Sequence, residues 1–156
     1  MNKAVPVIVG LGVDRLEEVD AISGAAFDPR YGEAWTKAQC LSAMAMPGHR
    51  LTGIEVEGVL AGYAITRTIF DESELLLLAV LPDHRGKGLG RALIEDWLGN
   101  AHRHGVVRAF LEMREDNSAV HLYRAMAFIP VGLRKSYYKG KDGILRNAIS
   151  MERILR

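Results

Sequence analysis

A short apolar run, a glycine-rich basic turn and an amphipathic run follow one another along the chain, and this succession constrains the fold more than any other feature. Leu75 to Val80 carries no polar side chain, which predicts a strand covered on both faces inside a sheet. After Leu81-Pro82, the turn from Arg85 to Arg91 reads Arg-Gly-Lys-Gly-Leu-Gly-Arg. Downstream, apolar residues recur at three- and four-residue steps, which predicts a helix packed on that strand. This stripe consists of Leu89, Ala92, Leu93, Trp97 and Ala101.

The turn has the chemistry of an anion site. Its glycines at positions 86, 88 and 90 remove Cβ atoms, so an anion can approach the free amide groups and positive dipole end of the helix. Three basic side chains add charge there. A P-loop would need a lysine where Leu89 stands, and no acidic residue follows about 20 residues later as in a dinucleotide fingerprint. The turn therefore predicts a phosphate-bearing cofactor of another class, with a plain strand-to-helix connection as the alternative.

Length and composition narrow the class of protein. The 156 residues fit one domain spanning 1–156, and 20 basic against 19 acidic residues provide no general basic surface for nucleic acid. The single Cys40 excludes an internal disulfide, fits a reducing cytoplasm and is expected to be a structural thiol. No secretion signal or membrane-length apolar run is present. We expect a soluble cytoplasmic protein with no membrane partner and no direct nucleic-acid partner.

Period and turn residues predict the remaining elements. Strands are predicted at 5–9, 50–56, 60–70, 107–114, 129–138 and 144–154, and helices at 14–27, 35–45 and 118–127. With the strand and helix around the glycine turn, the order is β-α-α-β-β-β-α-β-α-β-β. The prediction is one α/β unit with a mixed, largely antiparallel sheet of about seven strands and about four helices.

The pattern Arg-x-x-Gly-x-Gly after an apolar strand resembles the acetyl-CoA pyrophosphate loop of the GNAT superfamily of N-acetyltransferases, whose fold has the same element order. Amide formation from a thioester needs a proton acceptor for the amine and a proton donor for the thiolate. Glu112, in a predicted strand beside the loop, is the candidate base, with a solvated strand-end glutamate as the alternative. Tyr123, at the edge of the apolar stripe of helix 118–127, is the candidate acid; a purely structural tyrosine is the alternative.

Several segments of the second half are similar, in order and approximate spacing, to the RimI-type N-terminal acetyltransferases, which acetylate the α-amino group of a ribosomal protein. They are Leu78-Ala79-Val80, Arg85 to Arg91, Leu111 to Arg114, Asn117, Leu122-Tyr123 and Ser136-Tyr137-Tyr138. The resemblance implies Glu112 as base, Tyr123 as acid, and acetyl-CoA as the co-substrate. The implied cofactor-binding residues are Leu78, Ala79, Val80, Arg85, Gly86, Lys87, Gly88, Leu89, Gly90, Arg91 and Asn117.

Two departures from this family stand out. One residue fewer than usual separates Asn117 from Tyr123, so either Asn117 or Asp116 occupies the cofactor-contacting position. The glycine that usually precedes the phenylalanine is Ala127 here. An alanine would be unfavourable if that position needs a positive φ, unless the helix ends differently.

The resemblance places the acceptor between the loop after the first helix and the final hairpin. This points to Trp35, Tyr137 and Tyr138 as substrate-binding residues. Trp35 could equally be a hydrophobic staple of the second helix, and two adjacent tyrosines in a strand face opposite sides, so at most one should line the cleft. The five histidines lack metal-ligand spacing, which predicts no metal.

The first functional hypothesis is an acetyltransferase that acts on the α-amine of a protein N-terminus, specifically that of a ribosomal protein. A lysine side chain or a small-molecule amine is the alternative acceptor, because it needs the same proton transfers. The third hypothesis is a module that binds acyl-CoA without catalysis. The presence of both Glu112 and Tyr123 argues against it.

Overall fold

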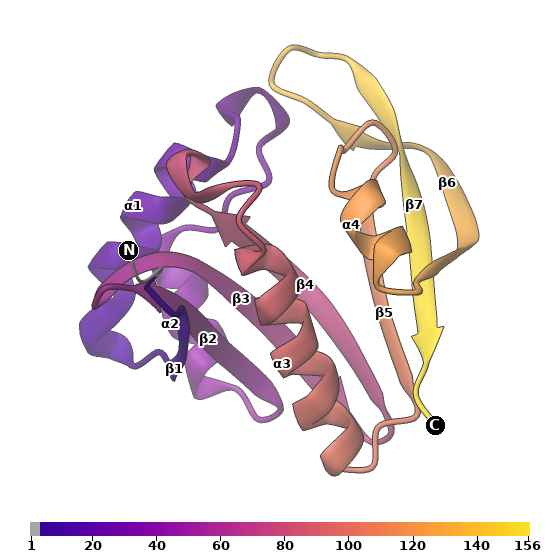
Figure 1. Ribbon diagram of the computed structural model, residues 1–156. Coiled ribbons are helices and arrows are strands. Elements are labelled where there is room, and N and C mark those ends of the chain that lie inside the picture. Colours follow the sequence, from indigo (N-terminus) through magenta and orange to yellow (C-terminus); the bar gives the residue numbers. More distant parts are fainter. Residues whose placement is uncertain (1–3) are drawn as a thin grey trace.

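A computed structural model describes residues 4–156, and within this range the chain builds a seven-stranded sheet with strand order β1-β2-β3-β4-β5-β7-β6 (Figure 1). Neighbouring strands are antiparallel except β4 and β5, which are parallel. The mixed, largely antiparallel sheet and the order of elements are as the sequence predicts. The strands are β1 (Val7–Gly10), β2 (His49–Val56), β3 (Val59–Ile69), β4 (Glu72–Val80), β5 (Arg108–Arg114), β6 (Ile129–Lys139) and β7 (Leu145–Ile154).

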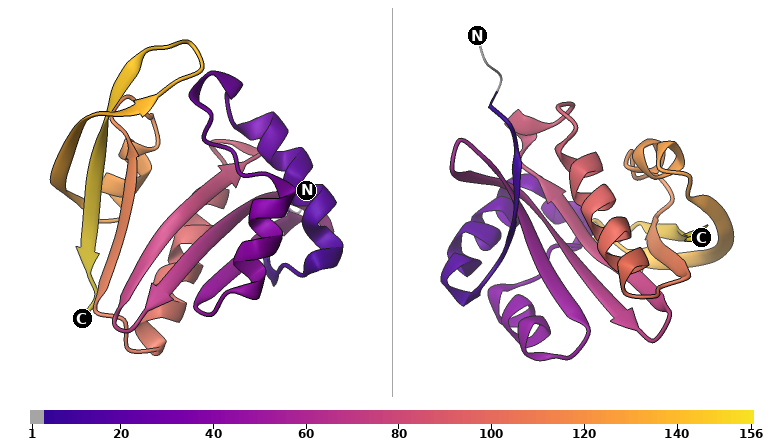
Figure 2. Two further views of the ribbon diagram at one scale, coloured as in Figure 1. Left: turned by 180° about the vertical axis from the view of Figure 1, so that it is seen from behind. Right: turned by 60° about the horizontal axis from the view of Figure 1, so that its bottom comes forward.

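Helices cover both faces of the sheet (Figures 1 and 2). One face carries α1 (Leu16–Ala26) and α2 (Lys37–Ala45), and the other carries α3 (Leu89–Arg103) and α4 (Val120–Ala125). Successive side chains of a strand point to opposite faces of the sheet, so each pair of helices packs against its own hydrophobic core. In residues 4–156, no helix is both long enough and apolar enough to cross a membrane.

The parallel pairing of β4 with β5 is short, and this feature creates the site. It runs only from Glu72 opposite Arg108 to Leu75 opposite Leu111. Beyond it, β4 stays paired with β3 and β5 stays paired with β7, so the two strands diverge into a wedge (Figure 1). The expectation that the 75–80 strand is covered on both faces is therefore wrong in part. Its buried residues alternate with half-buried ones because the wedge leaves one side incompletely covered.

The upper half of β4 presents backbone groups to this wedge. Leu81 donates its N–H to the carbonyl of Ala61 at 2.8 Å, on the β3 side. Backbone groups in an antiparallel pair alternate between the partner strand and the opposite side. Leu78 and Val80 therefore direct their N–H and C=O groups away from β3, where β5 has already diverged.

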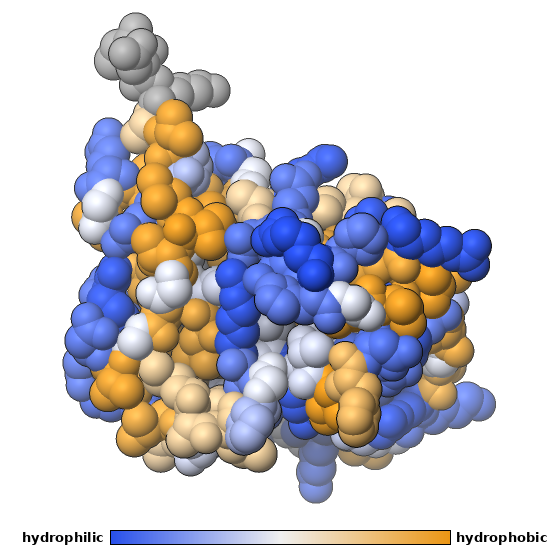
Figure 3. All heavy atoms as spheres, turned by 90° about the horizontal axis from the view of Figure 1, so that it is seen from below, coloured by the Kyte–Doolittle hydropathy of each residue, from blue (hydrophilic) through white to orange (hydrophobic). Residues whose placement is uncertain are grey.

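The two outer strands of the sheet, β1 and β6, carry apolar side chains at the surface (Figure 3). Seen from below, orange spheres lie over β1, next to the grey residues, and over the opposite edge of the molecule. Exposed apolar residues on these strands are Val7, Ile129, Val131 and Leu133. Edge strands lack a neighbour on one side, which explains their exposure.

Two buried hydrogen bonds hold helices to the sheet. Trp97 of α3 donates its Nε1–H to the hydroxyl of Ser73 on β4 at 2.8 Å. On the other face, the hydroxyls of Ser23 on α1 and Tyr63 on β3 lie 2.6 Å apart. Among the described residues no buried side-chain nitrogen or oxygen lacks a partner, as expected of a well-formed core.

Candidate active site

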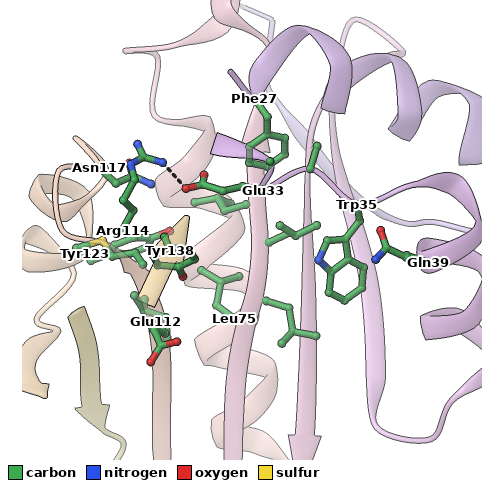
Figure 4. Close-up of a pocket in the computed structure, with 17 residues that line it drawn as sticks. Phe27, Glu33, Trp35, Gln39, Leu75, Glu112, Arg114, Asn117, Tyr123 and Tyr138 are labelled. Carbon is green, nitrogen blue, oxygen red and sulfur yellow. Dashed lines mark hydrogen bonds and ion pairs between the residues drawn. The ribbon is translucent and has the colours of Figure 1, made fainter. Parts of the chain in front are cut away.

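Two adjoining cavities occupy the wedge. The first, named here the Glu112 cavity, has a volume of about 380 Å³ and is bounded by Glu112, Trp35 and Tyr138 (Figure 4). The second, the Gly86 cavity, has a volume of about 500 Å³ and is bounded by the glycine turn and α4. Residues common to both walls are Phe27, Glu33, Leu78, Arg114, Asn117 and Tyr123. Tyr123 therefore lies at the boundary of both cavities, together with the other five shared residues.

The glycine turn has the backbone shape that the sequence pattern indicates. Gly86 and Gly88 have φ angles of 74° and 81°, a left-handed conformation that favours glycine. At Gly90, an added Cβ atom would lie 3.2 Å from Leu122 of α4, so glycine allows this close approach. The first bond of α3 runs from the N–H of Ala92 to the carbonyl of Gly88. The preceding amides of the helix are consequently free to bind an anion.

The predicted cofactor residues fall into two groups. Those lining the Gly86 cavity are Leu78, Ala79, Val80, Arg85, Gly86, Gly90 and Asn117. Those outside its wall are Lys87, Gly88, Leu89 and Arg91. The side chain of Leu89 is buried in the core, so only its backbone could reach a ligand. Arg91 forms an exposed ion pair with Glu95 at 3.0 Å.

Arg85 has a role that its charge alone does not suggest. Its guanidinium donates to the carbonyl oxygen of Ala26, the last residue of α1, at 2.8 Å. This bond joins the glycine turn to the opposite face of the sheet. Arg85 thus shapes the Gly86 cavity as well as adding positive charge to it.

Glu112 lies on β5 and is one of the residues that line the Glu112 cavity (Figure 4). Its Oε2 accepts a hydrogen bond from Ser150 Oγ at 3.3 Å and lies 3.2 Å from Arg134 Nε. Its Oε1 has no hydrogen bond to any residue in the range 4–156. One carboxylate oxygen is therefore held by the neighbouring strands, and the other can accept a proton.

The end of α4 determines the position of Tyr123. The N–H of Phe128 donates to the carbonyl of Tyr123 and the N–H of Ala127 donates to that of Arg124, both at 3.0 Å. These two bonds form a Schellman motif, and the rings of Tyr123 and Phe128 make its hydrophobic contact edge to face, with centroids 6.1 Å apart. Ala127 occupies the left-handed position with φ 67°, where glycine is favoured.

Tyr123 is more buried than the helix pattern indicates. The sequence predicts a residue at the edge of the apolar stripe, whereas the structure places its ring inside the core, because the chain turns back at Ala127 and packs Phe128 against it. Burial, with a smaller contribution from the charge of Glu33, raises the pKa of Tyr123. The phenol therefore keeps its proton at neutral pH and is available as a donor to the cavities it lines.

Asn117 and Asp116 have different surroundings. Asn117 lines both cavities, and its Oδ1 accepts a hydrogen bond from the N–H of Ala119 at 2.9 Å. Asp116 lines neither cavity and forms ion pairs with Arg114 and Arg146. Of the two, Asn117 is the one positioned to meet a ligand.

Of the three predicted acceptor-binding residues, two line the Glu112 cavity and one lies outside it. Trp35 lines the Glu112 cavity and also packs half-buried against the α1–α2 core, next to the capping box that Thr36 forms with Gln39. Tyr138 lines the same cavity, and burial with the nearby charge of Glu112 raises its pKa to about 12. Tyr137 lies outside the cavity, with its ring centroid 5.3 Å from that of Tyr138.

Glu33 and Arg114 are site residues that the sequence reasoning did not single out. They form an ion pair between the two cavities (Figure 4). A signal was present for Arg114, because it shares the period-2 face of β5 with Glu112. Glu33 gave no comparable signal, since it lies in a loop 81 positions from its partner. Within the described range, no group of three or more His, Cys, Asp or Glu residues could hold a metal.

The glycine turn, the diverging strands and the two joined cavities define the class of this protein. The chain belongs to the acetyltransferase (GNAT) family, which it matches over residues 16–128. It is 39% identical over 87 residues to the "[Ribosomal protein bS18]-alanine N-acetyltransferase" of Escherichia coli, covering 55% of this chain and 59% of the relative. It is also 36% identical over 143 residues to "N-alpha-acetyltransferase RimI" of Mycobacterium tuberculosis, covering 86% of this chain and 85% of the relative.

Solved structures show the same fold. The crystal structure of the ribosomal-protein-S18-alanine N-acetyltransferase from Escherichia coli superimposes with a TM-score of 0.86 at 29% identity, covering 96% of this chain and 94% of that one. Ard1 from Thermoplasma volcanium gives a TM-score of 0.82 at 24% identity, covering 97% of this chain and 98% of that one. The first match agrees with the sequence relatives, and the second shows the fold alone.

Proposed function

We propose that this chain is an acetyl-CoA-dependent N-acetyltransferase whose acceptor is the α-amine of a protein N-terminus. The observation that carries the proposal is the shared boundary of the two cavities, which includes Tyr123, with Glu112 lining one cavity and the glycine turn lining the other. Such an arrangement holds a thioester and an amine at a common point. Reaction between two groups held in the right orientation is faster than reaction between groups that must first meet in solution.

The Gly86 cavity fits acetyl-CoA by its donor chemistry. The free backbone groups of Leu78 and Val80 match the amides of a pantetheine arm, as a neighbouring strand would. The left-handed glycines and the free amides of α3 suit a pyrophosphate. The Asn117 side chain offers an amide in the wall of this cavity. When bound there, acetyl-CoA supplies the acetyl group as a thioester.

The two proton-transfer roles follow from the surroundings of each side chain. Glu112 has a free carboxylate oxygen in the acceptor cavity, and it removes a proton from the incoming ammonium directly or through a water. Tyr123 keeps its proton because of burial, and it protonates the departing thiolate. Base and acid come from different elements of the structure, β5 and α4.

The specific acceptor is suggested by the relatives. Proteins whose names specify alanine of ribosomal protein bS18 match this chain by sequence and by fold. We therefore propose an N-terminal alanine of that ribosomal protein as the acceptor. Trp35 and Tyr138 line the Glu112 cavity on the acceptor side and would contact the first residues of the peptide.

Two peptides test the acceptor class. One has a free N-terminal alanine and no lysine, and the other has a blocked N-terminus and an internal lysine. After incubation with acetyl-CoA, mass spectrometry should show one added acetyl group on the first peptide alone. Modification of the second alone would assign the enzyme to lysine side chains. Modification of neither would contradict the alanine proposal.

Substitutions test the two catalytic roles. Glu112→Gln and Tyr123→Phe should each lower kcat by about 10²- to 10⁴-fold, because each removes one proton-transfer group while keeping the side-chain shape. Glu57→Gln, at an exposed position in the turn between β2 and β3, is the matched carboxylate control and should retain wild-type turnover. Turnover within a few-fold of wild type in both active-site variants would refute these roles.

A further inference from the structure

The loop between α1 and α2 crosses the open side of the wedge, and Tyr31 anchors it on the far side. The ring centroid of Tyr31 lies 3.4 Å from the Cζ atom of Arg114 and 4.7 Å from that of Arg146. Arg114 belongs to β5 and Arg146 to β7. Figure 1 shows the loop and the β6–β7 hairpin approaching each other above the wedge, and Figure 2 shows the same contact from behind.

Carboxylates hold both arginines in place. Arg114 forms ion pairs with Glu33 and Asp116. Arg146 Nη2 lies 2.8 Å from Asp142 Oδ2, and its Nε lies 3.5 Å from Asp116 Oδ2. Only 8% of the Arg114 side chain and 13% of the Arg146 side chain are exposed. Attraction between a guanidinium and an aromatic ring is stronger when both are shielded from water, so these contacts are strong ones of their kind.

The backbone adds a second attachment. The N–H of Lys141, in the β6–β7 hairpin, donates to the carbonyl oxygen of Arg30 at 2.7 Å. The adjacent Gly140 permits this approach, because a Cβ atom there would lie 2.9 Å from the same oxygen. The loop is thus fixed to the hairpin through the backbone of Arg30 as well as through the Tyr31 ring.

This anchored loop forms part of the wall that the two cavities share. Glu33 lines both cavities, as does its partner Arg114, and Tyr31 lines the Gly86 cavity. Arg146 and Arg30 line neither cavity. A loss of the Tyr31 contacts would release the loop and move Glu33, which changes both cavities together.

We propose that Tyr31 is a positioning residue of acetyl transfer. Its ring, in contact with Arg114 and Arg146, fixes Glu33 in the wall shared by the acetyl-CoA cavity and the acceptor cavity. The inference rests on the proposed function for the identity of the two substrates. Its distinctive consequence is that a residue outside the acceptor cavity controls the affinity for both substrates.

The test compares Tyr31→Leu with Tyr31→Phe. Tyr31→Leu should weaken the Kd for acetyl-CoA, measured by calorimetry without acceptor, and raise the KM for the alanine peptide, each by about 5- to 30-fold. Tyr31→Phe should restore both values to within about twofold, because the attraction uses the ring face and not the hydroxyl. Arg146→Gln should shift both constants in the same direction as Tyr31→Leu, although Arg146 lies outside both cavities.

A matched control comes from the same loop. Arg30 also lies near the Tyr31 ring, 4.9 Å from its centroid, but its side chain is exposed and pairs with Asp28 at 2.7 Å. Arg30→Gln should therefore leave both constants unchanged. Its behaviour separates a general effect of removing positive charge from the specific contacts of Arg114 and Arg146.

The outcomes are distinct. A Kd for acetyl-CoA within twofold of wild type in Tyr31→Leu would overturn the inference. So would a fall in Tm in that variant combined with unchanged constants in Arg146→Gln, because Tyr31 would then only stabilise the fold. Failure of the wild-type protein to acetylate the alanine peptide would count against the proposed acceptor alone, since the acetyl-CoA Kd values are measured without it.

Discussion

Replacing Ala127 by glycine should make the protein more stable. Ala127 has φ 67° at the left-handed position of the Schellman motif that ends α4. An L-residue with a Cβ atom is destabilised there by about 1–2 kcal/mol, and glycine is not. Glycine in turn loses about 0.5–1 kcal/mol through the larger conformational entropy of its unfolded chain. The net expectation is a gain of about 0.5–1 kcal/mol in the free energy of unfolding.

Little else changes at this position. Ala127 is exposed, so removing its methyl group takes almost no apolar area out of the core. The hydrogen bonds of the motif use backbone atoms and remain. For a chain of this size, about 1 kcal/mol corresponds to a rise of about 2–4 °C in Tm. Thermal and urea unfolding of the purified variant would measure the gain.

Ala125→Gly provides the matched control. Ala125 is also exposed, but it is the last residue of α4 and has ordinary helical backbone geometry. Glycine there should lower the free energy of unfolding by about 0.5–1 kcal/mol. Opposite signs for the two variants are expected. A Tm for Ala127→Gly equal to or below that of wild type would refute the view that the alanine at this position is strained.

Two further substitutions test the buried hydrogen bonds. Ser73→Ala should lower the free energy of unfolding by about 1–3 kcal/mol because it leaves the buried Trp97 N–H without its acceptor, whereas Ser42→Ala, at an exposed site on α2, should have little effect in the same urea titration. Tyr63→Phe should cost about 1 kcal/mol at pH 8 by removing the bond to Ser23. Burial raises the pKa of Tyr63 from 10.0 to about 12. The protonated phenol therefore stabilises the fold fully below pH 10, and this stabilisation is lost as the pH rises through about 12. The urea midpoint of Tyr63→Phe should fall less than that of wild type between pH 8 and 12, and equal pH dependence of the two midpoints would contradict this assignment.

Much of the fold was predictable because local patterns report it. The helix after the glycine turn was predicted from its apolar spacing, and α3 buries the residues of that stripe, with Ala92 half-buried. Strand boundaries differ from the prediction by up to three residues, as at β4, which begins at Glu72 rather than Leu75. There the polar Glu72, Ser73 and Glu74 belong to a strand segment that pairs with both β3 and β5. Strand β4 extends to these polar residues because they pair with neighbouring strands, which their amino-acid types alone do not indicate.

The candidate site was predictable in its residues but not in its arrangement. Glu112 and Tyr123 follow from motif positions, and both line the Glu112 cavity. The anchoring of Tyr31 and the ion pair of Glu33 with Arg114 have no local pattern, because the partners are far apart in the chain. The burial of Tyr123 likewise depends on Phe128 folding back after Ala127.

The sequence by itself determined the order of helices and strands, the glycine turn and the two proton-transfer candidates, because each depends on periods and spacings within a few residues. Only the tertiary structure decided where β4 and β5 separate. That separation occurs because each strand keeps a better-paired neighbour on its other side, β3 for β4 and β7 for β5. Hydrogen bonding across the sheet thus opens the wedge. Arg114, which contacts both Tyr31 and Glu33, then lines both cavities, as does Glu33.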